Sequence, residues 1–169
     1  MKMLETRKVA YAVVLVTLGV ILSPYTSIPL DIAKINPTQH FINVLAAVLL
    51  GPWYAFTVAL VISIIRNAMG TGTLLAFPGS IIGALLAGYA FKIVRNVYGA
   101  ALAEIIGTGI IGSLTAVFLV APVFVGKATT LAAIMPAFLG STIVGSLIAI
   151  LALKVLERAG YAPMVKKPA

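Results

Sequence analysis

Long apolar runs separated by short polar connections set the pattern of this chain. Each run is apolar nearly all round, which is typical of helices that cross a membrane. The first run ends in Ser23-Pro24-Tyr25 without a small-x-small cleavage site, so we expect a retained first helix that Pro24 terminates. Four runs bounded by charged, proline or glycine residues predict helices over about 6–23, 78–94, 98–122 and 130–157, and a helix over about 54–69 depends on how the stretch 39–65 divides.

A further stretch, residues 39–65, is interrupted by Gly51-Pro52 and is compatible with one kinked helix or two short ones. With a break there are six helices with both termini cytoplasmic, and nine Lys and Arg residues lie inside against three outside. Without a break there are five helices, and the split becomes five inside to seven outside. The positive-inside rule therefore favours six helices. A helix over 39–50 would be about 18 Å long. Against a bilayer core of about 30 Å, it must begin within the preceding loop or stop short of the far surface.

The composition places the chain in a membrane. Of its 169 residues, 62% are hydrophobic and 9% are charged, and the mean hydropathy is +1.15. Soluble domains carry about 25% charged residues. We therefore expect an all-α integral membrane protein, with a single transmembrane domain over residues 1–169 built as a six-transmembrane-helix bundle.

The net charge of +8 does not indicate a nucleic-acid partner. The basic residues lie at the ends of apolar runs, where the positive-inside rule puts them, so we expect the lipid bilayer of a prokaryotic plasma membrane instead. The sequence has no cysteine, which excludes thiolate sites, and no phosphate-binding P-loop of a built-in ATPase. One His and four widely spread carboxylates suggest no metal cluster and no nucleophile–base pair, so we expect no metal, no cofactor and no enzymatic activity.

The connection over residues 66–80 is the most unusual polar stretch. It contains three of the chain's 15 glycines, which let the backbone turn, and Pro78 suits a helix start. It is either a tight loop between two membrane helices or a lid that closes over a ligand. Its candidate ligand contacts are Arg66, Asn67, Thr71, Thr73 and Phe77. Arg66 is expected at the outer surface, where its side chain can also simply reach the lipid headgroups.

His40 and Asn43 are three residues apart and therefore share one helix face. Both are costly on a lipid-facing surface, so we expect them to face the interior of the bundle. An intramembrane histidine is either a hydrogen-bonded structural residue or a ligand contact. Because His40 and the 66–80 connection are expected on the same outer side, ligand contact stays open.

Glu104 is the only carboxylate well inside a predicted span, so it should face protein or a cavity. It heads a stripe with Thr108, Ile111 and Thr115. We expect it toward the cytoplasmic end, away from Arg66, in a structural salt bridge or a contact to a partner subunit.

Three blocks of sequence, residues 37–44 (PTQHFINV), 50–55 (LGPWYA) and 66–80, carry a family resemblance. In them the chain resembles the substrate-binding S components of energy-coupling factor vitamin transporters, and most of all their thiazole-type ThiW members. The resemblance implies a six-helix S component with a substrate site near the outer face, closed by loops 1, 3 and 5 and the outer halves of helices 4 to 6.

The same resemblance implies partners and a substrate. The partners are a transmembrane T component and two cytoplasmic ATPases, and the substrate is hydroxyethylthiazole, a precursor of thiamine. The family often carries an Ala-xxx-Ala surface on helix 1 for docking the T component. Here the corresponding residues are Thr6, Ala10 and Val14, so the docking surface is less sharply marked.

These observations predict a binding subunit that captures a small heterocycle and does no chemistry. Alternatives are an S component for thiamine or hydroxymethylpyrimidine, and a stand-alone proton-coupled carrier that uses Glu104, although no inverted repeat is visible. An intramembrane enzyme using His40 or Glu104 is disfavoured because the two are expected toward opposite membrane faces. The expected substrate-binding residues are Tyr25, Gln39, His40, Asn43, Arg66, Asn67, Thr71, Thr73 and Phe77, with Thr115 and Ser141, between the fifth and sixth helices, as the alternative location.

Overall fold

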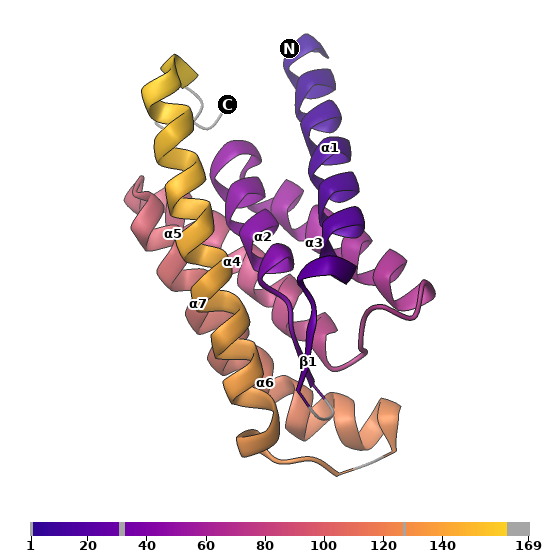
Figure 1. Cartoon of the computed structure of the whole chain (residues 1–169). Coiled ribbons are helices and arrows are strands. Elements are labelled where there is room, and N and C mark those ends of the chain that lie inside the picture. The colour runs from indigo at the N-terminus through magenta and orange to yellow at the C-terminus, as the bar shows by residue number, and fades with distance from the viewer. Residues whose placement is uncertain (1, 31–32, 127, 162–169) are drawn as a thin grey trace.

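A computed structural model of the chain describes residues 2–30, 33–126 and 128–161. It is a bundle of six helices with one small hairpin, because α5 to η2 form one unbroken helix and η3 continues α7 (Figure 1). The six helices predicted from the sequence are thereby confirmed. In chain order the elements are α1 (Lys2–Thr26), β1 (Ile28–Leu30), β2 (Ala33–Ile35), α2 (Pro37–Leu50), α3 (Pro52–Ala68), α4 (Ala76–Val94), α5 (Val97–Glu104), η1 (Ile105–Gly112), α6 (Ser113–Thr115), η2 (Ala116–Val125), α7 (Leu131–Leu156) and η3 (Glu157–Tyr161).

Four of the described helices are long and apolar enough to cross a membrane. These spans are Glu5–Thr26, Ala76–Val94, Val97–Val125 and Leu131–Gly160. The other two helices, α2 with 14 residues and α3 with 17, are about 21 and 26 Å long, shorter than a bilayer core of about 30 Å. Two possibilities were predicted for the short helix, and both apply to α2. It begins at Pro37, two residues before the predicted start, and it is still too short to reach across the bilayer core.

The chain breaks between α2 and α3 at Gly51-Pro52, so residues 39–65 form two helices rather than one kinked one. Gly51 has φ 93°, a left-handed conformation that glycine adopts without steric cost, and Pro52 takes the first position of α3. A Cβ on Gly88 of α4 would collide with Pro52. The break is therefore held by close packing of α4.

Two predicted boundaries differ in the structure. α1 continues through Pro24 to Thr26; a proline this near the end of a helix affects only its last turn. The segment that follows α1 forms an antiparallel hairpin, with Ile28 opposite Ile35. α4 begins at Ala76 rather than Pro78, since the first turn of a helix has N–H groups without helical partners and accepts a proline.

α2 lies at the centre of the bundle. It packs against α1, α3, α4, α5 and α7, and eleven of its 14 residues are buried. The face of α7 toward it is made of small residues, and a Cβ on Gly145 would lie 2.9 Å from the Cβ of His40. Close approach of α7 thus seals the polar first turn of α2 inside the protein.

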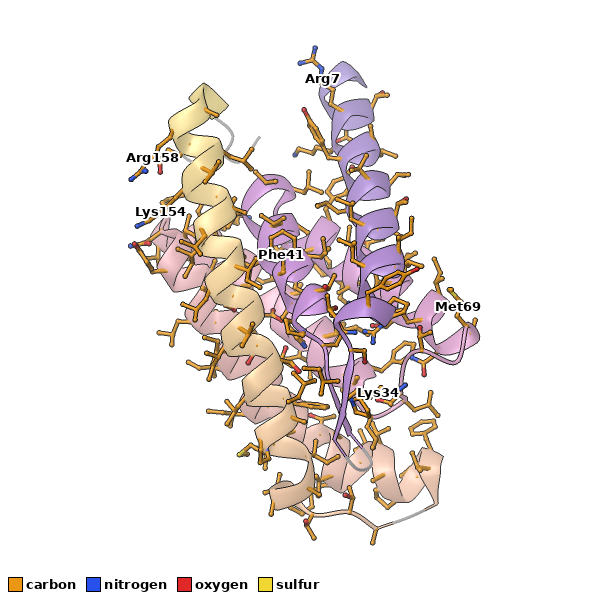
Figure 2. All side chains as sticks on the ribbon, in the orientation of Figure 1. Arg7, Lys34, Phe41, Met69, Lys154 and Arg158 are labelled. Carbon is orange, nitrogen blue, oxygen red and sulfur yellow. The ribbon has the colours of Figure 1, made fainter. Side chains whose placement is uncertain are left out.

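The two ends of the bundle differ in charge and in structure. The start of α1 and the end of α7 lie at one end (Figure 1), which we call the terminal end. Arg7, Lys154 and Arg158 lie there, whereas Lys34 lies toward the opposite end (Figure 2). That opposite end holds the hairpin, and we call it the hairpin end.

Candidate functional site

The start of α2 is fixed by Asn36. Its side-chain oxygen accepts a hydrogen bond from the Gln39 backbone N–H at 3.2 Å, which caps the helix. Its amide nitrogen donates to the carbonyl of Ser23 at 3.1 Å, and its backbone N–H donates to Ser141 Oγ at 2.9 Å. The first turn of α2 is therefore tied to α1 and α7, which orients Gln39, His40 and Asn43.

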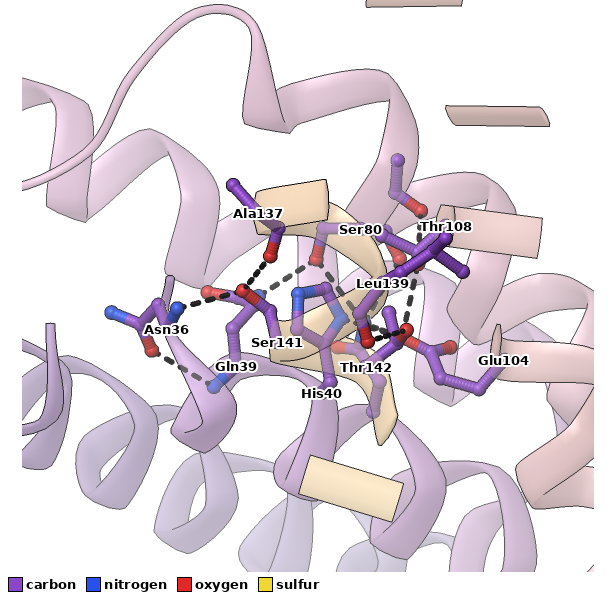
Figure 3. Close-up of polar contacts among 12 residues, drawn as sticks. Asn36, Gln39, His40, Ser80, Glu104, Thr108, Ala137, Leu139, Ser141 and Thr142 are labelled. Atoms are coloured by element: carbon purple, nitrogen blue, oxygen red, sulfur yellow. Dashed lines mark hydrogen bonds and ion pairs between the residues drawn. The ribbon is translucent and has the colours of Figure 1, made fainter. Parts of the chain in front are cut away.

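One carboxylate oxygen lies within hydrogen-bond distance of three side chains in the interior of the bundle (Figure 3). Glu104 Oε1 lies 2.8 Å from His40 Nδ1, 3.0 Å from Asn43 Nδ2 and 3.1 Å from Thr108 Oγ1. The donor in the contact with His40 depends on the histidine tautomer: His40 donates from Nδ1 to an ionised Glu104, which can only accept. Glu104 is fully buried and its other oxygen, Oε2, has no partner within the described part of the chain. His40 thus turns its second ring nitrogen away from Glu104.

The contact between His40 and Glu104 contradicts the expectation that they lie toward opposite membrane faces. The charge pattern used for that expectation locates helix ends but not the depth of a side chain. Gly83 and Gly107, which have no side chains, let α4 and η1 approach closely, since a Cβ on Gly107 would lie 2.7 Å from Gly83 Cα. The structural contact expected for Glu104 is therefore made to His40 of α2.

Ser80 of α4 extends this network toward α3. Its Oγ accepts from Gln39 Nε2 at 2.9 Å and from Asn43 Nδ2 at 3.2 Å, and its carbonyl accepts from Asn43 Nδ2 at 3.1 Å. Gln39 Oε1 in turn accepts from Arg66 Nη1 at 3.0 Å. A continuous chain of hydrogen bonds thus joins Arg66 to Glu104 through α2 and α4.

Arg66 is buried, with 5% of its surface exposed, and not at the surface as predicted. Besides Gln39, it reaches the carbonyl of Thr71 from Nη2 at 3.4 Å, and its Nε is buried without a partner in the described ranges. Lys34 Nζ donates to the same Thr71 carbonyl at 3.3 Å. The bend of the 66–80 connection over the end of α3 covers the guanidinium, which explains why it does not reach the headgroups.

A cavity of about 30 Å³ adjoins this network and is enclosed by α2, α3, the start of α4, η1 and α7. That is room for one or two water molecules. Its walls mix cationic, neutral polar and aromatic side chains, and both Phe77 and Phe138 contribute rings. The residues that line it are Lys34, Asn36, Gln39, His40, Ser63, Arg66, Asn67, Gly72, Thr73, Ala76, Phe77, Ser80, Thr108, Phe138 and Ser141.

The structure brings most of the predicted site residues to this cavity. Those that line it are Gln39, His40, Arg66, Asn67, Thr73, Phe77 and Ser141. Asn43 lies in the network without lining it, and Thr71 contributes its backbone carbonyl. Ser141 therefore belongs with the first group of predicted residues rather than to a separate location between the last two helices.

Two predicted residues lie elsewhere. Tyr25 is 86% exposed, and Thr115 donates to the carbonyl of Ile111 within its own helix. The expected stripe from Glu104 also divides, because Ile111 is exposed while Thr108 is buried. Neither Tyr25 nor Thr115 lines the cavity.

Sequence reasoning missed eight residues that line the cavity: Lys34, Asn36, Ser63, Gly72, Ala76, Ser80, Thr108 and Phe138. Lys34 and Asn36 lie in the loop now seen as a hairpin, and the Asn36-Pro37 pair is a helix-start signal that places both beside the first turn of α2. Ser63, Ser80 and Phe138 have no comparable signal, because single serines and phenylalanines are ordinary in apolar helices.

The predicted docking residues share an exposed face of α1. Thr6, Ala10 and Val14 are all exposed, and the helix contacts the bundle through its opposite side, where Leu15 is buried. Within the described ranges no three His, Asp or Glu side chains cluster as a metal site.

Comparison with known proteins gives a match to one family. A family model described as thiamine-precursor transporter protein (ThiW) matches residues 9–159. The matched region contains every residue of the cavity and of the network below it. No curated protein and no solved structure matches the chain in the same comparisons.

Proposed function

The chain belongs to the ThiW family of thiamine-precursor transporters, and from this premise we propose that it is the substrate-capture subunit of an energy-coupling factor importer. Its substrate is hydroxyethylthiazole, bound in the cavity at the hairpin end, which faces the outside of a prokaryotic cell. The observation that carries the proposal is the cavity itself, where polar side chains from five helices converge in an otherwise apolar bundle. Polar groups within a membrane-spanning bundle cost free energy, and a cluster of them is therefore typical of a functional site.

The chemistry of the cavity suits this ligand. A thiazole ring offers a flat π surface, a ring nitrogen that accepts a hydrogen bond and a hydroxyethyl arm that both donates and accepts. Phe77 and Phe138 provide surfaces for the ring. With Nδ1 donating to Glu104, the Nε2 of a neutral His40 accepts from the hydroxyl, whereas a protonated His40 donates to the ring nitrogen.

Binding requires the cavity to widen. Its volume of about 30 Å³ is too small for a heterocycle, so the side chains above the network must move outward. The 66–80 connection is the element proposed to make this motion, because its Gly72 and Thr73 line the cavity and the Thr71 carbonyl accepts from Arg66. This supports its role as a lid, the second of the two readings of that connection.

The orientation follows from the charges. Arg7, Lys154 and Arg158 gather at the terminal end (Figure 2), and the positive-inside rule puts that end in the cytoplasm. The cavity end then faces outside, where substrate is captured. The T component and two cytoplasmic ATPases supply the energy, and the exposed α1 face of Thr6, Ala10 and Val14 docks the T component.

The experiment is equilibrium binding to the purified chain alone, by isothermal titration calorimetry, with hydroxyethylthiazole, hydroxymethylpyrimidine and thiamine. We expect saturable binding of hydroxyethylthiazole without ATP or partner subunits, and weaker binding of the other two. Tighter binding of thiamine or hydroxymethylpyrimidine would assign the chain to a different precursor. Binding of none of the three would contradict the proposed function.

A second experiment separates a binding subunit from a self-sufficient carrier. The buried His40–Glu104 pair is the one observation that favours a proton-coupled carrier. In proteoliposomes that contain this chain alone, we expect no accumulation of hydroxyethylthiazole with or without a proton gradient. Accumulation driven by the gradient would revive the carrier.

A further inference from the structure

Arg66 is a buried cation that no carboxylate of the described residues accompanies. Its guanidinium donates to two neutral acceptors, Gln39 Oε1 and the Thr71 carbonyl. No carboxylate among the described residues contacts it, and the Oε1 atom of Glu104 instead lies beside His40, Asn43 and Thr108. A buried charge is strongly unfavourable unless an opposite charge accompanies it, and the described residues leave the charge of Arg66 uncompensated.

Lys34 adds a second cation at the same place. Its Nζ and Arg66 Nη2 donate to one and the same oxygen, the carbonyl of Thr71, at 3.3 and 3.4 Å. Two positive charges are therefore drawn together around a single neutral acceptor. Both residues line the cavity.

The unused edge of the guanidinium has the shape for an oxyanion. Arg66 Nε has no partner in the described part of the chain, and Nε–H together with the neighbouring Nη2–H forms the side of the guanidinium that holds two oxygens of one anion. The Nη2 bond to Thr71 is long, at 3.4 Å. The first turn of α4, through Ala76 and Phe77, also lines the cavity, and the N-terminus of a helix favours negative charge.

We propose that the cavity binds an anionic oxygen group, a phosphate ester or a carboxylate carried by the thiazole precursor, through Arg66 and Lys34. This inference rests on the proposed function and deepens it: the anionic form of the precursor binds more tightly than the neutral alcohol. The thiazole ring lies against Phe77 and Phe138, and the anionic group completes the coordination of Arg66. A purely structural Arg66, which only clamps the 66–80 connection to Gln39, would affect every ligand equally.

The test is calorimetric titration of the purified full-length chain with three ligands: hydroxyethylthiazole, its phosphate ester, and a methylthiazole carrying a carboxylate. Inorganic phosphate alone is the reference for anion binding without the ring. We expect at least one anionic thiazole to bind about tenfold or more tightly than the alcohol, as a bidentate charged hydrogen bond permits. The phosphate and carboxylate arms then identify which group the site prefers.

Variants locate the effect. Arg66→Gln keeps a polar side chain without the charge and should abolish the preference for the anionic form. Lys34→Gln, at a half-buried position in the hairpin, should reduce that preference by a smaller factor without endangering the bundle. Lys92→Gln, exposed at the end of α4 and remote from the cavity, removes the same charge elsewhere and should change no affinity.

Each outcome is decisive. If the alcohol binds as tightly as both anionic forms, the inference is wrong and the proposed function stands. Equal losses for all three ligands in Arg66→Gln would make Arg66 a structural clamp and overturn the inference. If Arg66→Gln does not fold, an unchanged preference in Lys34→Gln overturns it. Binding of no thiazole at all would overturn the inference together with the proposed function.

Discussion

At the scale of single residues, Glu104 is the point on which the buried polar groups converge. Its Oε1 lies within hydrogen-bond distance of three side chains on two helices, and the single hydroxyl hydrogen of Thr108 is shared between this oxygen and the Gly79 carbonyl. Asn43 is the most connected donor, because its amide reaches Glu104 and both oxygens of Ser80. Its own Oδ1 has no partner in the described chain, so Asn43 serves here as a donor that joins α2 to α4 and α5.

Asn43→Ala should lower the free energy of unfolding by about 1–3 kcal/mol, because buried acceptors lose their donor. Thermal unfolding of the purified protein in detergent measures the loss. Thr57→Ala is the control, since it removes only an exposed hydrogen bond to the Trp53 carbonyl. A melting temperature for Asn43→Ala equal to that of Thr57→Ala would show that the buried network contributes nothing to stability.

His40→Ala should weaken hydroxyethylthiazole binding roughly 5- to 150-fold, the equivalent of one hydrogen bond lost in a dry pocket. Calorimetry on the variant gives the ratio. Thr17→Ala, which removes an exposed bond on α1, provides the comparison for non-specific effects. Unchanged affinity in His40→Ala would mean that the histidine only supports Glu104.

Residue patterns predicted part of this site and could not have predicted the rest. The three-residue spacing of His40 and Asn43 was sufficient to put both inside the bundle, since helical periodicity is local. Their contact with Glu104 depends on how deeply a 14-residue helix lies beside a much longer one, and a sequence of apolar residues carries no signal for that depth. Ser80 could not be predicted for the same reason, because it accepts hydrogen bonds from Gln39 and Asn43 only once α4 packs on α2.

At the scale of helices, glycine contacts set the distance between α4 and the helix formed by η1 and α6. A Cβ on Gly112 would collide with Gly79, and one on Gly83 would lie 2.6 Å from Glu104 Oε2. These contacts bring backbone against backbone, which lets Thr108 donate to the carbonyl of Gly79 at 2.8 Å. The position of the carboxylate therefore depends on glycines from both helices.

Gly112→Ala should destabilise the protein by about 1–3 kcal/mol, because the added methyl forces two backbones apart. Thermal unfolding and calorimetric binding on the same sample measure stability and its effect on the site. Gly99→Ala lies near the start of the same long helix, and its Cβ would have no neighbour closer than 3.6 Å, so it should be neutral. Equal behaviour of the two variants would contradict the role of the Gly112 contact.

At the scale of the whole molecule, two short helices produce an asymmetric bundle. Because α2 and α3 are shorter than the membrane is thick, the hairpin and the 66–80 connection fill the space that full-length helices would occupy (Figure 1). The sequence predicted two short helices here. The Gly51-Pro52 pair indicated the break, and the distribution of Lys and Arg over the two membrane faces favoured the same division. It could not predict the hairpin, whose strands are three residues each and lack a recognisable alternation.

The orientation of the bundle gives a labelling prediction. Since the chain has no cysteine, single cysteines introduced at Arg7, Arg158 and Met69, all exposed, can be labelled without background. In intact cells, a membrane-impermeant thiol reagent should label Met69→Cys and leave the two terminal-end variants unlabelled until the cells are opened. Labelling of Arg7→Cys or Arg158→Cys from outside would contradict cytoplasmic termini.

The central claim, that the cavity beside His40 and Arg66 captures a thiazole precursor, is tested most directly by a fluorophore placed in its wall. The sole tryptophan, Trp53, is 65% exposed and packs near Phe56 and Tyr89, outside the cavity. Replacing it by Phe and introducing Phe77→Trp moves the emission to the cavity. Titration with hydroxyethylthiazole or its phosphate ester should then change the emission saturably, with the dissociation constant that calorimetry gives, while the parent protein's Trp53 emission stays constant. Calorimetric binding with no change at Phe77→Trp would place the ligand elsewhere and contradict the account.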